Sequence, residues 1–260
     1  MPIRDWSNFI GGRIAVVTGS GAGVGRAIAM HMARAGAELW INDLDLSRAE
    51  SVCAEIEAEG GMARPVIGDV CDPSSVHVMA NTTGPVDILV NNAGSGVRAF
   101  ADKTATYTTF AESEPHEWEP VMRVNLTGVL HVTHRYLPDM LEREWGRILT
   151  IVSDAGRKGE RRQVVYGAAK AAAMGFTRGL AAEVGRQGVT VNCLSLGTMR
   201  HGPAAEMTDE QERKLASNYP VGRLGRVDDP APIAVMLCSD AGEWITGQVY
   251  PVDGGYAPAL

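Results

Sequence analysis

Short apolar runs alternate with longer amphipathic stretches along almost the whole chain. The apolar runs have the length of strands and lie at Ile14–Thr18, Glu38–Asn42, Ala63–Ile67, Val86–Val90, Arg147–Ser153, Val189–Leu194 and Gln248–Val252. Helical periodicity fills the intervals at Gly25–Ala35, Leu46–Glu59, Pro115–Leu141, Val164–Gln187 and Pro230–Cys238. Such alternation is typical of a parallel sheet covered by helices on both faces. The pattern predicts one α/β domain over residues 1–260, with a doubly wound sheet of about seven strands.

Two intervals depart from this alternation. Between Asp69 and Asp87 only Asp72–Ala80 has a helical pattern, which predicts a helix of hardly two turns. The threonine-rich segment Val97–Glu114 has no period, so we expect a long loop there. Long loops on a rigid sheet are commonly functional, and this one is a candidate lid.

The composition is that of an ordinary globular protein, with 45% hydrophobic and 21% charged residues. The formal net charge of −7 argues against nucleic acid or an anionic membrane as a partner, because both require a positive field. We therefore expect a small-molecule substrate.

Four cysteines, Cys53, Cys71, Cys193 and Cys238, lie far apart without the spacing of a zinc site. We expect free, buried thiols and no metal.

The first residues lack the apolar core of a signal peptide, and no run approaches the roughly 20 apolar residues that span a bilayer. These features predict a cytoplasmic location.

A glycine-rich turn follows the first predicted strand and leads directly into a helix. It runs from Thr18 to Gly25, with glycines at 19, 21, 23 and 25. Glycines let the backbone approach a pyrophosphate closely, and the free N–H groups at the helix start attract its charge. The turn predicts a Rossmann-like dinucleotide site, although a tight connection without a ligand would have the same glycines.

Asp43 ends the second strand, near the distance of about 20 residues expected for the acid that binds the adenosine ribose. Its carboxylate would accept hydrogen bonds from the ribose hydroxyls and would repel a 2′-phosphate. Neither Ser20-Gly21-Ala22 nor Leu44 supplies a compensating cation. The sequence therefore favours NAD(H) over NADP(H), the alternative being an aspartate that only caps a turn.

Tyr166 and Lys170 are four residues apart, so both lie on one face of the predicted helix. A nearby ammonium stabilises a phenolate and lowers a phenol pKa that starts near 10, which brings proton transfer within reach of neutral pH. Ser153 ends the preceding strand, where open α/β sheets bind ligands, and its hydroxyl can donate to a carbonyl oxygen. Taken alone, each of these residues would also fit a solvated helix or a simple turn.

Together the motifs resemble those of the short-chain dehydrogenase/reductase family. They are Thr18-Gly19-x-x-x-Gly23-x-Gly25, Asn91-Asn92-Ala93-Gly94, Asn125, Ser153, Tyr166-x-x-x-Lys170 and Val252-Asp253-Gly254-Gly255. The resemblance extends over residues 12 to 256. It implies that Tyr166 is the proton donor in reduction and the base in oxidation, and that Ser153 polarises the carbonyl. Lys170 would hold the nicotinamide ribose, and Asn125 would bend its helix and hold a water that links Lys170 to solvent.

The resemblance also implies a set of cofactor contacts. Asp69 and Val70 would flank the adenine, and Asn91 to Gly94 would form the floor of the site. The full expected set is Gly19, Ser20, Gly23, Val24, Gly25, Asp43, Leu44, Asp69, Val70, Asn91, Ala93, Gly94, Tyr166, Lys170, Gly197, Thr198 and Met199.

One departure from the family pattern follows the sixth strand. The family usually has Pro-Gly and then a threonine that meets the nicotinamide amide, whereas this chain has Leu196-Gly197-Thr198-Met199-Arg200-His201. The nicotinamide contact of Thr198 is therefore in question.

These features predict an NAD-dependent alcohol dehydrogenase or ketone reductase. Four cations lie in Gly156–Arg162, directly after Ser153, and arginine is well suited to bidentate contact with anions. They favour an anionic substrate such as a 3-oxoacyl thioester, unless they are only solvated loop charges. The alternatives are a neutral cyclic, sugar or steroidal alcohol as the substrate, and a dinucleotide sensor without chemistry.

The predicted helices Pro115–Leu141 and Val164–Gln187 carry apolar residues around much of their circumference. This pattern predicts a homotetramer, and a thicker monomeric core would explain it equally.

Overall fold

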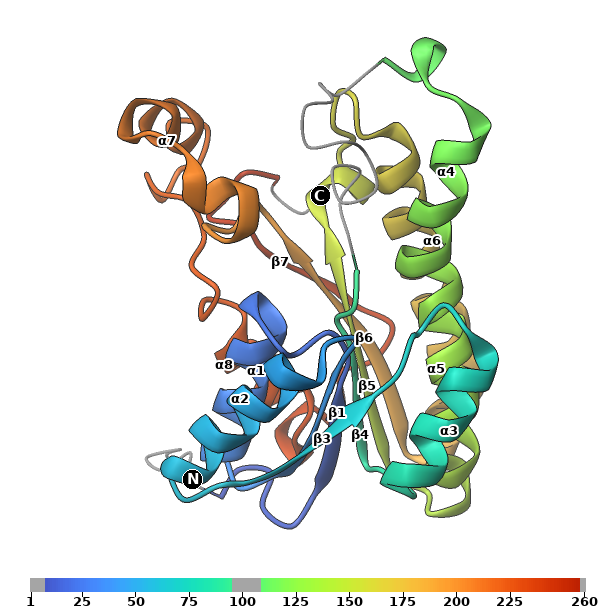
Figure 1. The fold of residues 1–260 in the computed structure, drawn as a ribbon. Helices are drawn as coiled ribbons and strands as arrows, with labels where there is room; N and C mark the ends of the chain where they lie inside the picture. The colour runs from blue at the N-terminus through green and yellow to red at the C-terminus, as the bar shows by residue number, and fades with distance from the viewer. Residues whose placement is uncertain (1–7, 95–108, 258–260) are drawn as a thin grey trace.

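The computed structural model describes residues 8–94 and 109–257. Within these ranges one sheet of parallel strands has the order β3-β2-β1-β4-β5-β6-β7 (Figure 1). The strands are β1 (Ile14–Val17), β2 (Glu38–Asp43), β3 (Met62–Ile67), β4 (Ile88–Asn91), β5 (Gly146–Ser153), β6 (Val189–Leu196) and β7 (Val249–Val252). The predicted doubly wound α/β sheet is confirmed. Its order reverses between β1 and β4, the point at which such sheets bind ligands.

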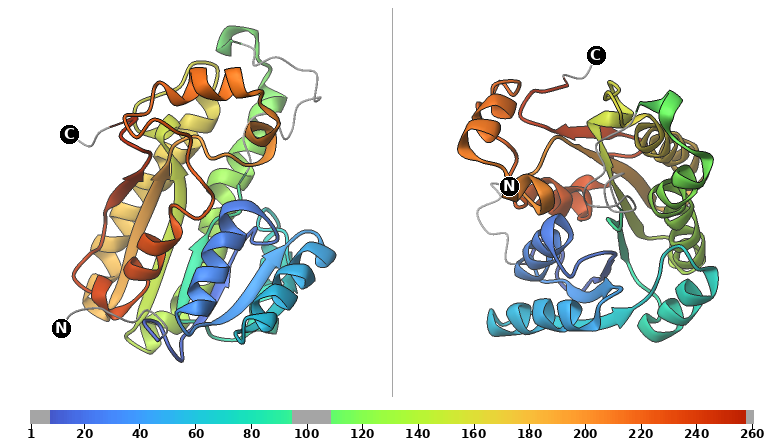
Figure 2. Two further views of the ribbon diagram at one scale, coloured as in Figure 1. Left: turned by 90° about the vertical axis from the view of Figure 1, so that its left-hand side faces the viewer. Right: turned by 45° about the horizontal axis from the view of Figure 1, so that its top comes forward.

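Helices cover both faces of the sheet (Figures 1 and 2). On one face lie α1 (Gly23–Arg34), α2 (Leu46–Ala58) and α8 (Ala231–Leu237). On the other lie α3 (Pro73–Thr83), α4 (Pro115–Met122), α5 (Gly128–Glu142) and α6 (Val164–Val184). None of the helices in the described ranges has both the length and the apolar character needed to cross a bilayer.

Strand β1 shows why the apolar runs are continuous. Val17 packs into the core beneath α1, α2 and α8, whereas its neighbour Val16 packs into the core beneath α3, α5 and α6. Both are fully buried, because successive side chains of a strand point to opposite faces and both faces are covered.

Helix α3 is longer than the sequence predicted. The expected helix of hardly two turns at Asp72–Ala80 is instead an 11-residue helix that continues to Thr83. Thr82 and Thr83 remain helical because their hydroxyls donate to the carbonyls of Val78 and Ala80, at 2.9 and 3.3 Å. The Thr83 hydroxyl also lies 2.9 Å from that of Tyr136 on α5, which ties the last turn to the core.

The predicted helix Pro115–Leu141 is divided by a π-helical turn at Arg123–Thr127. Asn125 is fully buried in this turn, and its Nδ2 donates to the Val121 carbonyl over 2.9 Å. A side chain that bonds a backbone carbonyl four residues back competes with the helical ladder. The regular α-helix is therefore interrupted at Asn125, the position at which a bend was expected.

Two parts of the chain differ from the predicted loops. Of the expected loop Val97–Glu114, residues 97–108 lie outside the described residues, and Phe110–Glu112 forms a 3₁₀ turn whose Phe110 ring stacks on Trp118. After β6, helix α7 (Asp209–Ala216) was not predicted, since only its capping residues Thr208 and Gln211 signal it and the segment has little apolar character.

Candidate functional site

The glycine-rich turn carries the chain from β1 into α1 at the carboxyl edge of the sheet. Gly19 and Gly23 have φ of +61° and +59°, the left-handed region that glycine adopts without strain. A Cβ on Gly25 would lie 2.4 Å from the Asn92 side chain and 2.6 Å from the Gly19 carbonyl. The glycines at these positions are therefore required by the backbone itself.

The start of α1 has the properties of an anion site. Its N-cap residue, Ala22, offers no side chain to the first N–H groups of the helix. Helix N-termini with free N–H groups attract phosphate through those donors and the helix dipole. The turn thus fits the pyrophosphate of a dinucleotide.

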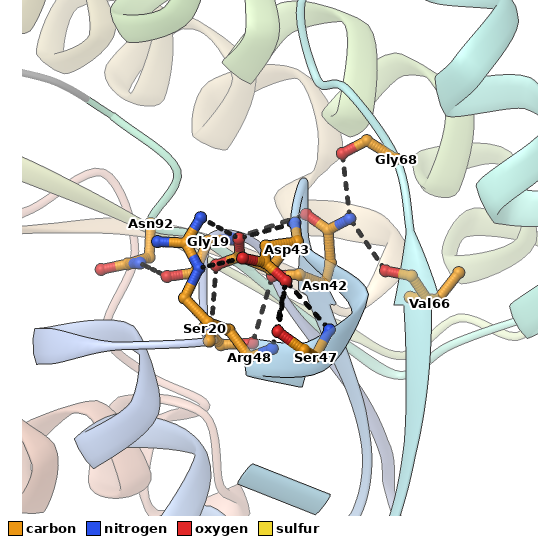
Figure 3. Close-up of polar contacts among 11 residues, drawn as sticks. Gly19, Ser20, Asn42, Asp43, Ser47, Arg48, Val66, Gly68 and Asn92 are labelled. Atoms are coloured by element: carbon orange, nitrogen blue, oxygen red, sulfur yellow. Dashed lines mark hydrogen bonds and ion pairs between the residues drawn. The ribbon is translucent and has the colours of Figure 1, made fainter. Parts of the chain in front are cut away.

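Asp43 ends β2 beside this turn, and its side chain is only 11% exposed (Figure 3). Its carboxylate accepts hydrogen bonds from the N–H groups of Gly21 and Asp45, each with a donor–acceptor distance of 3.1 Å. The Arg48 guanidinium lies 3.2 Å away, although the sequence had indicated no cation near Asp43. Arg48 comes from the first turn of α2, which folds back over the end of β2.

Two asparagines hold the turn between neighbouring strands (Figure 3). Asn42 is buried, and its side-chain amide donates to the carbonyls of Val66 and Gly68, each at a distance of 3.1 Å. Asn92 donates to the carbonyls of Thr18 and Gly19 over 2.9 and 3.0 Å. Asn92 lines the cleft and belongs to the segment Asn91 to Gly94 that was expected to form its floor.

The expected catalytic residues converge on the same cleft. Ser153, Tyr166 and Lys170 line it together with the nucleotide turn and Asp43. The Lys170 Nζ lies 5.8 Å from the centre of the Tyr166 ring, as their spacing on α6 predicts. The Ser153 Oγ accepts a hydrogen bond from the Ala155 N–H over 3.2 Å, which fixes the serine at the end of β5.

Lys170 is almost completely buried behind Tyr166, and its Nζ donates to the Ile151 carbonyl over 3.0 Å. Burial lowers the pKa of Lys170 to about 8. A Cβ on Gly94 would lie 2.9 Å from the Asn125 Oδ1 and 3.2 Å from the Lys170 Nζ. Gly94 therefore leaves room for the lysine and the asparagine to approach each other.

The expected cofactor residues fall into two groups. Those that line the cleft are Gly19, Val24, Gly25, Asp43, Ala93, Gly94, Tyr166, Lys170, Gly197 and Met199. Others support the cleft from behind: the Ser20 Oγ donates to the Val17 carbonyl over 2.7 Å, and the Asn91 Nδ2 to the Thr133 Oγ1 over 3.0 Å.

Four further expected contacts do not line the cleft. Asp69 accepts from the Cys71 N–H over 2.8 Å and thereby shapes the turn after β3. Val70 is buried against Gly128, and Leu44 is 69% exposed. Thr198 faces a separate hollow, where its N–H donates to the Tyr219 hydroxyl over 3.0 Å.

The basic segment after Ser153 is partly neutralised within the protein. Arg157 lies 3.0 Å from the Asp154 carboxylate and 3.4 Å from that of Asp253. Lys158 lies over the Tyr256 ring and 3.4 Å from Glu160. Of the four cations expected to meet a substrate, Arg161 and Arg162 are exposed without an ion pair among the described residues.

Asp154 forms a buried polar cluster beside Ser153. Its Oδ1 accepts from the Ser195 hydroxyl over 2.7 Å, while its Oδ2 has no hydrogen-bond donor among the described residues. Burial and the nearby carboxylate of Asp253 raise the pKa of Asp154. The cluster joins the end of β5 to β6 and to the turn after β7.

The four cysteines are free; Cys53, Cys193 and Cys238 are buried and Cys71 is half-buried. Burial raises the pKa of each thiol to about 11 or 12. Within the described ranges, no group of histidine, cysteine and acidic side chains is arranged as a metal site.

The chain matches known proteins over nearly its whole length. A family model described as enoyl-(acyl carrier protein) reductase matches residues 19–257. The 3-oxoacyl-(acyl-carrier-protein) reductase FabG of Aquifex aeolicus is 36% identical over 249 residues, 94% of this chain and 97% of the relative. The subunit BbsD of a hydroxy(phenyl)methylsuccinyl-CoA dehydrogenase from Thauera aromatica is 34% identical over 94% of this chain and 96% of the relative.

Solved structures agree with these relatives. A 3-oxoacyl-(acyl-carrier-protein) reductase from Brucella melitensis has a TM-score of 0.91 and 31% identity, and covers 98% of this chain and 96% of its own. A gluconate 5-dehydrogenase from Burkholderia cenocepacia was solved with NADP and tartrate. It has a TM-score of 0.88 and 31% identity, and it covers 98% of this chain and 99% of its own.

The fold and the cleft define an oxidoreductase of a class that binds nicotinamide dinucleotides. The chain belongs to the short-chain dehydrogenase/reductase family, as the sequence motifs had implied.

Proposed function

We propose that this chain interconverts a secondary alcohol and a ketone by hydride transfer with NAD(H), with both the cofactor and the catalytic site in one domain of residues 1–260. The observation that carries the proposal is the single cleft that Ser153, Tyr166 and Lys170 share with Asp43 and the turn before α1. A sensor without chemistry would not require the three polar side chains at the substrate end of the cleft.

In the direction of reduction, the bound nicotinamide supplies a hydride to the carbonyl carbon. The Ser153 hydroxyl donates a hydrogen bond to the carbonyl oxygen, where negative charge develops. The Tyr166 hydroxyl gives its proton to the same oxygen, and in oxidation the phenolate accepts that proton. Ser153 thus orients the carbonyl, and Tyr166 performs the acid and base chemistry.

Lys170 supports the proton transfer from behind Tyr166. A lysine whose pKa is about 8 still carries its charge at neutral pH, and this charge stabilises the phenolate that remains after proton donation. Asn125 and Lys170 approach each other around Gly94, an arrangement that suits a relay of protons toward solvent. We assign Asn125 the role of holding that relay.

Asp43 supports the preference for NAD(H). Its carboxylate lies at the end of β2, fixed by two backbone N–H groups and only slightly exposed. A 2′-phosphate brought there would meet like charge, whereas ribose hydroxyls would find an acceptor. Arg48 already neutralises part of this charge, so the preference rests on the Asp43–Arg48 pair.

A 3-oxoacyl thioester or another anionic ketone is the proposed substrate. The relatives from Aquifex aeolicus and Thauera aromatica are named for acyl thioester substrates. Arg161 and Arg162 are exposed cations five and four residues before Tyr166 in the chain, and we propose that they bind an anionic handle.

A second candidate is a sugar or a neutral cyclic or steroidal alcohol. The similarity to a gluconate 5-dehydrogenase of equal length favours the sugar class. The decisive experiment follows NADH consumption by the purified chain with acetoacetyl-coenzyme A, 5-ketogluconate and a cyclic ketone, and repeats it with NADPH. The proposal expects the fastest turnover with NADH and the thioester.

We also propose that the chain assembles as a homotetramer. Helix α6 has an exposed stripe of small residues, including Ala168, Ala171, Ala172 and Gly175, which lets another helix approach closely. Light scattering tests this directly, because a mass near the 27.7 kDa of one chain would exclude assembly.

A further inference from the structure

The segment after β6 brings a histidine to the nucleotide end of the cleft. A Cβ placed on Gly23 would lie 2.5 Å from the Nε2 of His201, so the imidazole packs directly against the first turn of α1. His201 is exposed, and it lines the same cleft as Gly25 and Lys170.

The backbone around His201 is held in place on both sides. The His201 N–H donates to the Met199 carbonyl over 2.8 Å, and the Arg200 N–H donates to the Gly225 carbonyl over 2.7 Å. Met199 and Gly225 also form a β-bridge. The position of His201 opposite Gly23 therefore follows from the backbone bonds of this loop.

The imidazole and the start of α1 point to the same kind of ligand. Ala22 leaves the first N–H groups of α1 without a side-chain cap, and Gly23, which has no Cβ, gives room for the His201 imidazole beside them. Of the lysine and arginine side chains that line the cleft, Arg48 is paired with Asp43, and Lys170 bonds the Ile151 carbonyl deep in the cleft. His201 is thus the side-chain donor placed at the helix start.

We propose that His201 is a cofactor-binding residue that donates a hydrogen bond from its imidazole to the pyrophosphate of the dinucleotide. The pyrophosphate would then lie between the N–H groups of α1 and the segment that follows β6. This inference rests on the proposed function only in that the cleft holds a dinucleotide. It gives the segment after β6 a contact with the phosphates that does not require Thr198.

Binding of ADP-ribose and of NADH tests the proposal without relying on turnover. Both ligands contain the pyrophosphate, but only NADH contains the nicotinamide. Isothermal titration would compare the wild type with His201→Ala, with His201→Gln, which keeps an N–H donor, and with His77→Ala, an exposed histidine on α3 outside the cleft lining.

We expect His201→Ala to weaken both ligands about equally, by about 10-fold, as the loss of one hydrogen bond to a charged group implies. His201→Gln should recover part of the loss, and His77→Ala should match the wild type. Unchanged or tighter binding in His201→Ala would overturn the proposal, as would a loss confined to NADH. If the wild type binds neither ligand, the dinucleotide site itself fails, and with it the proposed function.

Discussion

The Arg48 guanidinium lies 3.2 Å from the Asp43 carboxylate at the end of β2. The carboxylate is nearly buried, whereas the arginine side chain is 54% exposed and can reach toward solvent. Asp43, the acid that we propose to discriminate against a 2′-phosphate, is therefore paired with a cation of the kind that binds phosphate. We propose that the balance between these two side chains sets the cofactor preference.

Replacing Asp43 by asparagine should shift the enzyme toward NADPH. The substitution removes the repulsive charge and frees Arg48, so the ratio of kcat/KM for NADH to that for NADPH should fall by about tenfold or more. The double variant Asp43→Asn/Arg48→Ala should lose the gain with NADPH, since the two residues act as a pair. Steady-state kinetics with both cofactors measures this, and an unchanged ratio in Asp43→Asn would contradict the assignment.

Replacing Lys170 by methionine should stabilise the fold while it abolishes turnover. The pKa of Lys170 is lowered from 10.5 to about 8, a cost of about 3 kcal/mol for the buried charge. That cost is fully present below pH 8 and disappears as the pH rises to 10.5, because the unfolded chain binds the proton more tightly in this window. Lys170→Met should thus be more stable than the wild type at pH 7.

Urea unfolding of both proteins at pH 7 and pH 10 measures the difference. The advantage of Lys170→Met should amount to at most about 3 kcal/mol at pH 7 and shrink at pH 10. An equal difference at the two pH values would show that packing, and not the buried charge, accounts for it.

Asparagine at position 154 should be tolerated. The pKa of Asp154 is raised, so the wild type loses stability as the pH rises from about 4 through the raised pKa. Asp154→Asn keeps the shape and lacks this titration, so its stability relative to the wild type should increase between pH 4 and pH 7. Asp154→Ala loses the contacts with Ser195 and Arg157 and should be less stable at both pH values. Thermal unfolding distinguishes them, and a pH-independent loss in Asp154→Asn would refute the account.

The double variant Arg161→Ala/Arg162→Ala tests the anionic handle. It should raise the KM for acetoacetyl-coenzyme A several-fold and leave that for neutral ethyl acetoacetate unchanged, because only the former carries phosphates. A higher salt concentration should raise the wild-type KM for acetoacetyl-coenzyme A, because salt screens the attraction between the arginines and the phosphates. Arg64→Ala/Arg186→Ala removes the same charge from exposed positions on β3 and after α6 and serves as the control. Equal KM changes for the two substrates would exclude a role for these arginines in anion recognition.

Most of the fold was predictable because local patterns determine it. The apolar runs of β1 and β4 are buried on both faces, and the glycines of the turn have no alternative at their backbone angles or contacts. The end of α3 was missed because threonine hydroxyls bonded to backbone carbonyls replace the apolar signal. Helix α7 was missed because its residues are mainly charged.

The site was predictable where motifs follow one another in the chain, as in Tyr166 and Lys170. His201 was missed because only the folded sheet brings it against Gly23, and Arg48 was missed because its side chain reaches Asp43 only when the first turn of α2 folds back over the end of β2. The contact between Arg157 and Asp253 was not predicted, because the two residues are 96 positions apart in the chain.

The rate of NADH consumption with acetoacetyl-coenzyme A, measured for the wild type and for Tyr166→Phe, tests the central claim most directly. Tyr166→Phe removes only the hydroxyl and should lower kcat by about 10²-fold or more, with the Kd for NADH largely unchanged. Near-normal turnover in Tyr166→Phe would contradict the assignment of Tyr166 as the acid and base.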